Sequence, residues 1–137
     1  EAGKDKQPNR QLVYGGGSLA ALALDVALRE RSGDTIGLPQ FMQALHAEFA
    51  KPGKAYALAD LERIAGSLTG SDFSGFFAEA VGNTSYFDIR PSYAAVGLRM
   101  DSFVEEMFIS REPAATPVQQ ARFRAVFGTP GAPCPRQ

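Results

Sequence analysis

The sequence QLVYGGGSLAALALDVALRER, residues 11–31, decides the fold of this chain. Three glycines separate an apolar run that ends at Tyr14 from residues 19–28, in which almost every side chain is apolar. Apolar residues that recur every three or four positions are typical of a buried helix. The predicted inward positions are Leu19, Leu22, Val26 and Ala27, with Leu24 and Leu28 on the flank.

A narrow polar strip runs along the same predicted helix. Asp25 and Arg29 are four residues apart with the acid first, which is the favourable orientation for an ion pair on a helix. Gly33 follows the charged last turn and is a typical C-terminal stop. The pattern therefore predicts one long helix that ends just before Gly33.

Composition and charge exclude several classes of protein. The 137 residues carry 14 Lys and Arg against 15 Asp and Glu, and a net charge of −1 offers no general attraction to nucleic acid or to an anionic membrane. We therefore expect neither nucleic acid nor a membrane as a partner. Cys134 is the single cysteine, so an internal disulfide is excluded. The polar residues 1–10 do not form a signal peptide, no stretch is long enough to span a bilayer, and we expect a soluble chain of cytoplasmic or periplasmic location.

Several shorter helices are predicted after the first. Pro39 lies in the first turn of a second helix, where proline is tolerated. This helix carries apolar side chains at helical spacing, namely Leu38, Phe41, Met42, Leu45 and Phe49. Further helices are expected at about 58–65, from Ser71 or Asp72 to residue 82, at 91–96, and after Thr116-Pro117 as far as Gly128.

The segment 98–109 is ambiguous at the level of sequence. Residues 98–100 fit a brief extended piece, and Ser102 with Glu105 fits a helix capping box. The apolar residues that follow fit either a helical face or a strand. Glu105 and Glu106 are interpreted as a solvated pair. Because strands are otherwise nearly absent, we predict an all-α array of about five to seven helices joined by short turns, with little or no β structure.

The three glycines invite a nucleotide-binding interpretation, which the context does not support. Gly15 to Ala20 matches the dinucleotide fingerprint GxGxxG/A at the start of a helix. That fingerprint requires a preceding core strand and later parallel strands, and neither is predicted here. No phosphate-loop GK[ST] follows. The glycines instead indicate a close approach of the backbone to something bulky at the head of the helix.

Side chains suited to metal binding or nucleophilic catalysis are scarce. His46 is the sole histidine and is expected to be a partly buried packing residue on the second helix. One histidine and one distant cysteine cannot supply the three or four ligands of a zinc site. No nucleophile lies beside a base. We therefore predict no metal and no cofactor within these residues.

An ordered set of segments resembles the C-terminal helical domain of glycyl aminopeptidase-type zinc metallopeptidases, which are related to the aminopeptidase N family. The segments are LVY with Gly17, LAALALDVALRERSG, LPQFMQALHAEF, YALADLERIAGSLTGSDFSGFFAEAVG and SYAAVGLRM. The most specific parts are Tyr-x-x-Gly before the LDxxLRxxS helix and the GxDFSxFF block at 70–77. The resemblance spans residues 12–100, and no PDZ module is visible beyond them.

The resemblance implies a division of labour between two domains. In such enzymes a thermolysin-like catalytic domain supplies an HExxH helix and a downstream Glu that hold zinc and activate a water. A tyrosine in a Tyr-x-Lys-Gly motif donates a hydrogen bond to the oxyanion of the tetrahedral intermediate, and Tyr14 falls on it. Gly15, Gly16 and Gly17 would then line the edge of the peptide-binding site. Gly16 replaces the lysine of the motif, and HExxH is absent.

We therefore expect an excised piece of a peptidase that carries one catalytic side chain and no metal. Residues 1–10 would be a flexible lead or linker, 11–128 the helical C-terminal domain, and 129–137 a Pro/Gly-rich tail. The catalytic domain and the peptide substrate are the expected partners, and the isolated chain is expected to be inactive. The alternative is a stand-alone helical interaction module without chemistry, whose glycine-headed groove binds a partner chain.

Overall fold

The chain divides into two compact units, Glu1–Ile89 and Arg90–Gln137. A computed structural model describes residues 14–82 and 87–129 of them. The predicted lead at 1–10, the residues 130–137 of the predicted tail, and Cys134 all lie outside the described residues.

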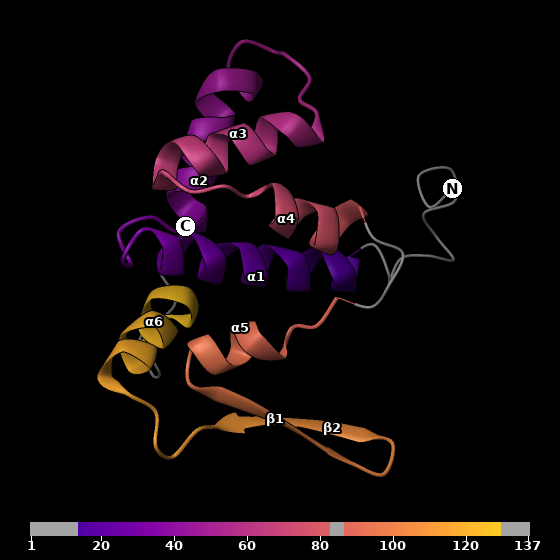
Figure 1. Ribbon diagram of the computed structural model, residues 1–137, viewed down its shortest axis with the longest axis vertical. Helices are drawn as coiled ribbons and strands as arrows, with labels where there is room; N and C mark the ends of the chain where they lie inside the picture. The colour runs from indigo at the N-terminus through magenta and orange to yellow at the C-terminus, as the bar shows by residue number, and fades with distance from the viewer. Residues whose placement is uncertain (1–13, 83–86, 130–137) are drawn as a thin grey trace, which may run out of the picture. The chain divides into compact units, whose positions relative to one another are not determined.

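The first unit is built of helical segments joined by short turns (Figure 1). They are α1 (Gly16–Arg31), α2 (Leu38–Leu45), the π-helical turn η2 (His46–Ala50), α3 (Leu58–Thr69), α4 (Ser74–Phe77) and the π-helical turn η3 (Ala78–Gly82). Helices α1, α2 and α3 contact one another, and α4 contacts α3. The predicted helices of this unit are confirmed, although α3 continues four residues past its predicted end. It stops at Gly70, whose φ of 70° is the left-handed conformation that favours glycine.

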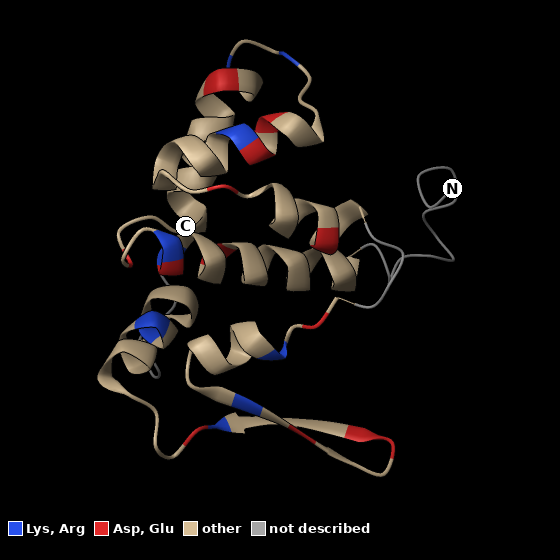
Figure 2. Cartoon of the chain, in the orientation of Figure 1, with Lys and Arg blue, Asp and Glu red and all other residues tan. Residues whose placement is uncertain are grey.

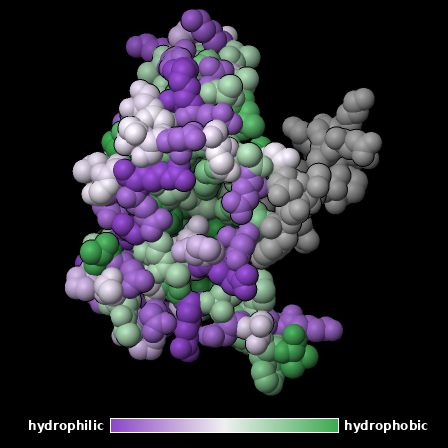
Figure 3. All heavy atoms as spheres, viewed as in Figure 1, coloured by the Kyte–Doolittle hydropathy of each residue, from purple (hydrophilic) through white to green (hydrophobic). Residues whose placement is uncertain are grey.

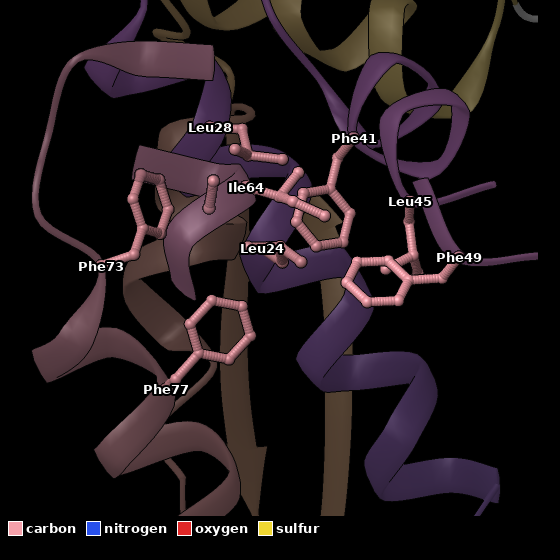
Figure 4. Packing of buried hydrophobic residues seen from close by; sticks show 9 residues of the cluster. Leu24, Leu28, Phe41, Leu45, Phe49, Ile64, Phe73 and Phe77 are labelled. Atoms are coloured by element: carbon pink, nitrogen blue, oxygen red, sulfur yellow. The ribbon is translucent and has the colours of Figure 1, made fainter. Parts of the chain in front are cut away.

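A single hydrophobic cluster holds these helices together. Leu24 and Leu28 of α1 point between two groups of aromatic residues, as Figure 4 shows. One group comes from the segment around α4 and the other from α2 and η2. The buried members of the cluster are Leu24, Leu28, Phe41, Leu45, Phe49, Ile64, Ala65, Phe73 and Phe77. Each large side chain in such a cluster stabilises the fold by roughly 1.5–3 kcal/mol.

The buried face of α1 differs from the predicted one. Leu24 and Leu28, expected on the flank, belong to the cluster, whereas Leu19, expected inside, is exposed. Leu22 is only half-buried, and Val26 is buried as predicted. Burial thus concentrates at 23–28, in the C-terminal half of the helix, and the N-terminal half is largely uncovered. Periodicity identifies a stripe on a helix, but only packing determines how far along the helix the stripe is covered.

A buried carboxylate joins α1 to α2. Asp25 is only 7% exposed, and its Oδ1 accepts hydrogen bonds from Nε of Arg29 at 3.0 Å and from the backbone N–H of Leu38 at 2.8 Å. Leu38 is the first residue of α2, so the carboxylate satisfies a donor that the helix itself leaves unpaired. The expected ion pair with Arg29 is confirmed. Asp25 is therefore a buried link between helices as well as part of a polar strip.

The start of α4 is also organised by a carboxylate. Oδ1 of Asp72 accepts from the backbone N–H of Ser74 at 2.9 Å, and Oδ2 accepts from the Ser74 hydroxyl at 2.8 Å. These hydrogen bonds, with a smaller contribution from the charge of Arg31, lower the pKa of Asp72 below its ordinary value. The predicted start at Ser71 or Asp72 is slightly early, because α4 begins at Ser74 with Phe73 at its N-cap position, and Asp72 bonds the first residue of the helix from just outside it.

The second unit contains α5 (Arg90–Ala95), an antiparallel hairpin of β1 (Leu98–Phe103) and β2 (Glu106–Arg111), and α6 (Pro117–Phe127). Helix α5 ends shortly before Gly97, whose φ is 69°. Thr116 is the N-cap residue of α6, and its side chain accepts from the N–H of Gln119. Both predicted helices are confirmed. Arg111 stacks on the Phe123 ring, 3.4 Å from its centroid, and so connects the hairpin to α6.

The prediction of an all-α fold with little or no β structure is wrong, because β1 and β2 form a two-stranded sheet. Its register pairs Leu98 with Arg111, Met100 with Ile109, and Phe103 with Glu106. The segment that fitted a capping box contains the hairpin turn, Val104-Glu105. The apolar residues of this segment satisfy a helical spacing and a strand alternation equally well, so pairing between the strands determines the outcome.

The link through Asp25 predicts that removing the Asp25 side chain lowers the free energy of unfolding more than removing the Glu48 side chain. Asp25→Ala leaves the N–H of Leu38 without its acceptor and the largely buried Arg29 without its counter-charge, so it should lower the free energy of unfolding by about 3 kcal/mol. Glu48→Ala removes the ion pair between Glu48 and Arg63, in which both side chains are about half exposed, and it should lower the free energy of unfolding by much less than Asp25→Ala does.

Urea denaturation of both variants, followed by circular dichroism, measures the difference. Equal shifts of the two midpoints would show that Asp25 does not join the helices.

Candidate functional site

The residue with a predicted chemical role, Tyr14, lies at the start of the longest helix. Its side chain is 63% exposed, and its backbone carbonyl accepts from the Ser18 hydroxyl at 2.8 Å. Tyr14 and Gly15 form a wider π-type turn that leads directly into α1. The phenol is therefore carried on a helix whose other half is anchored in the hydrophobic cluster. An aromatic donor on a fixed helix suits binding to a partner surface.

The three glycines adopt helical geometry instead of the expected turn. Gly15 has φ −66° and ψ −50°, and Gly16 and Gly17 are the first residues of α1. A Cβ added at any of the three would meet no atom within 4 Å. The expected close approach to a bulky group is therefore not made by the described residues. All three glycines are exposed, as are Ser18 and Leu19 next to them, so this end of α1 is a bare surface.

Gly37 differs from glycines 15–17, because a side chain at position 37 would clash with neighbouring atoms. At Gly37, an added Cβ would lie 2.6 Å from Oδ1 of Asp25 and 2.5 Å from a guanidinium nitrogen of Arg29. That glycine lets the start of α2 approach the buried ion pair. The described residues place no comparable constraint on glycines 15–17, so their exposed surface can contact another molecule or domain.

His46 is exposed, and the expectation that it packs as a partly buried residue is wrong. It begins η2, where the backbone widens and the N–H of Lys51 bonds the carbonyl of His46 at 2.8 Å. Such π-type turns occur frequently at functional sites. His46 and the buried Phe49 both line a hollow beside η2.

The hollow beside η2 has a volume of about 330 Å³. It is lined by Met42, Leu45, His46, Phe49, Ala50, Lys54 and Tyr56. Leu45 and Phe49 are buried, and the rings of Phe49 and Tyr56 meet edge to face with centroids 6.0 Å apart. An apolar floor with an imidazole, an ammonium and a phenol around it is the composition of a small binding site. The volume is near the lower end of the roughly 300–1,000 Å³ usual for ligand pockets.

The sequence carried a partial signal for this hollow. Met42, Leu45 and Phe49 follow the spacing of one apolar helical face, which predicts core, and His46 lies beside that face. Lys54 and Tyr56 come from the connection between η2 and α3, and no local pattern relates them to that face. Only the folding back of this connection brings the polar groups to the apolar floor. The structure does not bring Tyr14 into the hollow.

No group of three or more His, Cys, Asp or Glu side chains suited to a metal ion occurs within 14–82 and 87–129. In the same residues, no helix is both long enough and apolar enough to cross a membrane. Comparison of the chain with protein-family models, with curated proteins and with solved structures reveals no match.

The helical geometry at Gly17 predicts a stabilising substitution. Gly17→Ala places a methyl group in open space and reduces the conformational freedom of the unfolded chain, so the free energy of unfolding should rise by roughly 0.5–1 kcal/mol. Urea denaturation measures the change. Gly97→Ala is the opposite control, because its φ is 69° and its Cβ would lie 2.9 Å from that of Ala115. Destabilisation by both variants would show that residue 17 is not free of contacts.

Proposed function

We propose that this chain is the C-terminal helical domain of a zinc-dependent metallo-aminopeptidase, which packs on a thermolysin-like catalytic domain. The support is the resemblance over residues 12–100 together with one geometric observation. The exposed phenol of Tyr14 stands on a bare helix end whose other end is anchored in the core. A surface of this kind suits contact with a second domain.

Tyr14 supplies the chemistry of this domain in the proposal. Its hydroxyl donates a hydrogen bond to the oxyanion that develops on the scissile carbonyl of the peptide. A phenol remains protonated at neutral pH and so can act as a neutral donor. Gly15, Gly16 and Gly17 present backbone without side chains beside it, which allows close approach of the peptide or of the catalytic domain.

The described residues contain no group of three or more His, Cys, Asp or Glu side chains that could hold zinc. In the proposal the metal is held entirely by the catalytic domain, and the 137-residue chain alone has no peptidase activity. Gly16 stands where the motif of the family has lysine. The contacts of that lysine are therefore missing, and the parent depends on the phenol and the glycine backbone at this edge.

A second candidate is a helical interaction module with no chemistry. The observation that favours it is the hairpin β1–β2, which exposes five large apolar side chains. The two candidate functions differ in the sequence that they require upstream of Glu1 in the gene. The peptidase requires an HExxH sequence upstream of Glu1 in the same reading frame, whereas a start codon immediately before Glu1 would leave the interaction module.

The peptidase proposal predicts a specific effect of Tyr14→Phe in the full-length parent. The ring and the helix are retained, so folding and zinc content should be unchanged. The rate of turnover should fall by roughly a hundredfold, mainly in kcat, because the lost hydrogen bond strengthens as charge develops on the carbonyl oxygen. Hydrolysis of aminoacyl-nitroanilides at matched zinc occupancy measures it.

Tyr56→Phe is the matched control. Tyr56 is exposed to a similar extent, 56% against 63% for Tyr14, and it lies at the hollow beside η2. The same hydroxyl is removed, so kcat should stay within about twofold of the parent if only Tyr14 reaches the reacting carbonyl. Equal kcat values for the parent and Tyr14→Phe would remove Tyr14 from the mechanism.

A further inference from the structure

The hairpin of the second unit carries its apolar side chains in solvent. Phe103 is 73% exposed and Val104 87%, and the group continues along β2. Its members are Phe103, Val104, Met107, Phe108 and Ile109. Figure 3 shows hydrophobic residues gathered at the free end of the hairpin. Contiguous exposed apolar side chains mark a surface that another molecule covers.

The two edges of the hairpin differ in how they are protected. No strand other than β1 and β2 occurs within the part of the chain that the structure describes, so each has one edge without a strand partner. Charged side chains interrupt β1 at Arg99 and Asp101, and charge on an edge strand opposes further pairing. Residues 107–110 of β2 carry no charge. The edge of β2 is therefore the one open to another strand.

The charges that flank this stretch have opposite signs. Glu105 and Glu106 lie at the turn, and Arg111 is the last residue of β2, followed outside the strand by Glu112. Figure 2 shows acidic residues at the turn end of the hairpin and basic residues toward its other end. An antiparallel alignment of two β2 strands places the acidic end of each beside the basic end of the other. A parallel alignment would instead place like charges together.

The turn adds a local constraint. Val104 has a φ of 58°, which is an unfavourable conformation for a β-branched residue. It lies in the two-residue turn closed by the pairing of Phe103 with Glu106, and tight hairpin turns of this length require a positive φ.

We propose that β2 pairs antiparallel with β2 of a second copy of this chain, forming a four-stranded sheet across a two-fold axis. A two-fold axis perpendicular to the sheet keeps each side chain on the same face of the sheet in both copies. Two residues can therefore lie opposite each other only if their residue numbers differ by an even number. The register centred on Phe108 meets this condition. It opposes Phe108 with Phe108 of the second copy, Met107 with Ile109, and Glu105 with Arg111.

This interface is small. Seven residues of each copy, 105–111, take part, which is well below the roughly 20–30 residues per side of a standard interface. The dimer is therefore weak, with a dissociation constant in roughly the micromolar to millimolar range. Main-chain hydrogen bonds along the edge and the apolar centre supply the affinity, and the flanking charges determine the direction.

Sedimentation equilibrium of the full 137-residue chain tests the pairing with two matched lysine variants. Phe108→Lys places two lysines opposite each other at the centre of the dimer, while within the hairpin it gains Asp101 as an oppositely charged partner across the strands. Self-association should weaken by about tenfold or more. Phe103→Lys is the same change on β1, and within the hairpin it faces Glu106. It should leave self-association unchanged.

A charge reversal at Glu105 tests the register. Glu105→Arg should weaken the dimer because the new arginine then faces Arg111 of the second copy, and Glu105→Gln, which only removes the attraction, should weaken it less. Circular dichroism of every variant establishes that it is folded. A parent chain that remains monomeric at the highest soluble concentration, equal effects of Phe103→Lys and Phe108→Lys, or self-association of Glu105→Arg equal to that of the parent would overturn the proposal.

Discussion

The arrangement of the first unit depends on one buried carboxylate. Oδ1 of Asp25 accepts from the guanidinium of Arg29 and from the backbone N–H of Leu38, and so it joins the middle of α1 to the first residue of α2. The absence of a side chain at Gly37 permits this approach. Because the start of α2 is held there, Phe41 and Leu45 meet Leu24 and Leu28 of α1 in the cluster (Figure 4). A charge removed from water is tolerated at this point because both of its hydrogen-bond partners are present.

Because the cluster covers only part of α1, this helix has a buried C-terminal half and an exposed N-terminal end. Its C-terminal half supplies the core, and its N-terminal end extends beyond it with the glycines and Tyr14 exposed. A rigid helix transmits the position of the core to the phenol, which a flexible loop would not do. This construction accords with the proposed role of Tyr14 at the edge of a peptidase active site, where a donor must be held in place before charge develops on the substrate.

The hairpin of the second unit, unlike the helices of the first, leaves large apolar side chains exposed. In the first unit, apolar side chains are gathered into one cluster, whereas β2 leaves Met107, Phe108 and Ile109 in solvent. A two-stranded hairpin alone is at best marginally stable, and here the contact of Arg111 with Phe123 supports it from α6. The uncharged centre of β2 and the opposite charges at its ends are consistent with an edge that is completed by a second copy.

The sequence by itself determined the helices that have strong local signals. The apolar period of α1, the proline and cap of α6, and the glycine stops at residues 33 and 97 all depend on contacts within a few residues. Tertiary structure decided what local spacing leaves open. It buried Asp25, exposed His46 above a hollow completed by Lys54 and Tyr56, and turned an ambiguous segment into a hairpin. Each of these outcomes depends on residues distant in the sequence, because burial and strand pairing are properties of the partner that a segment meets.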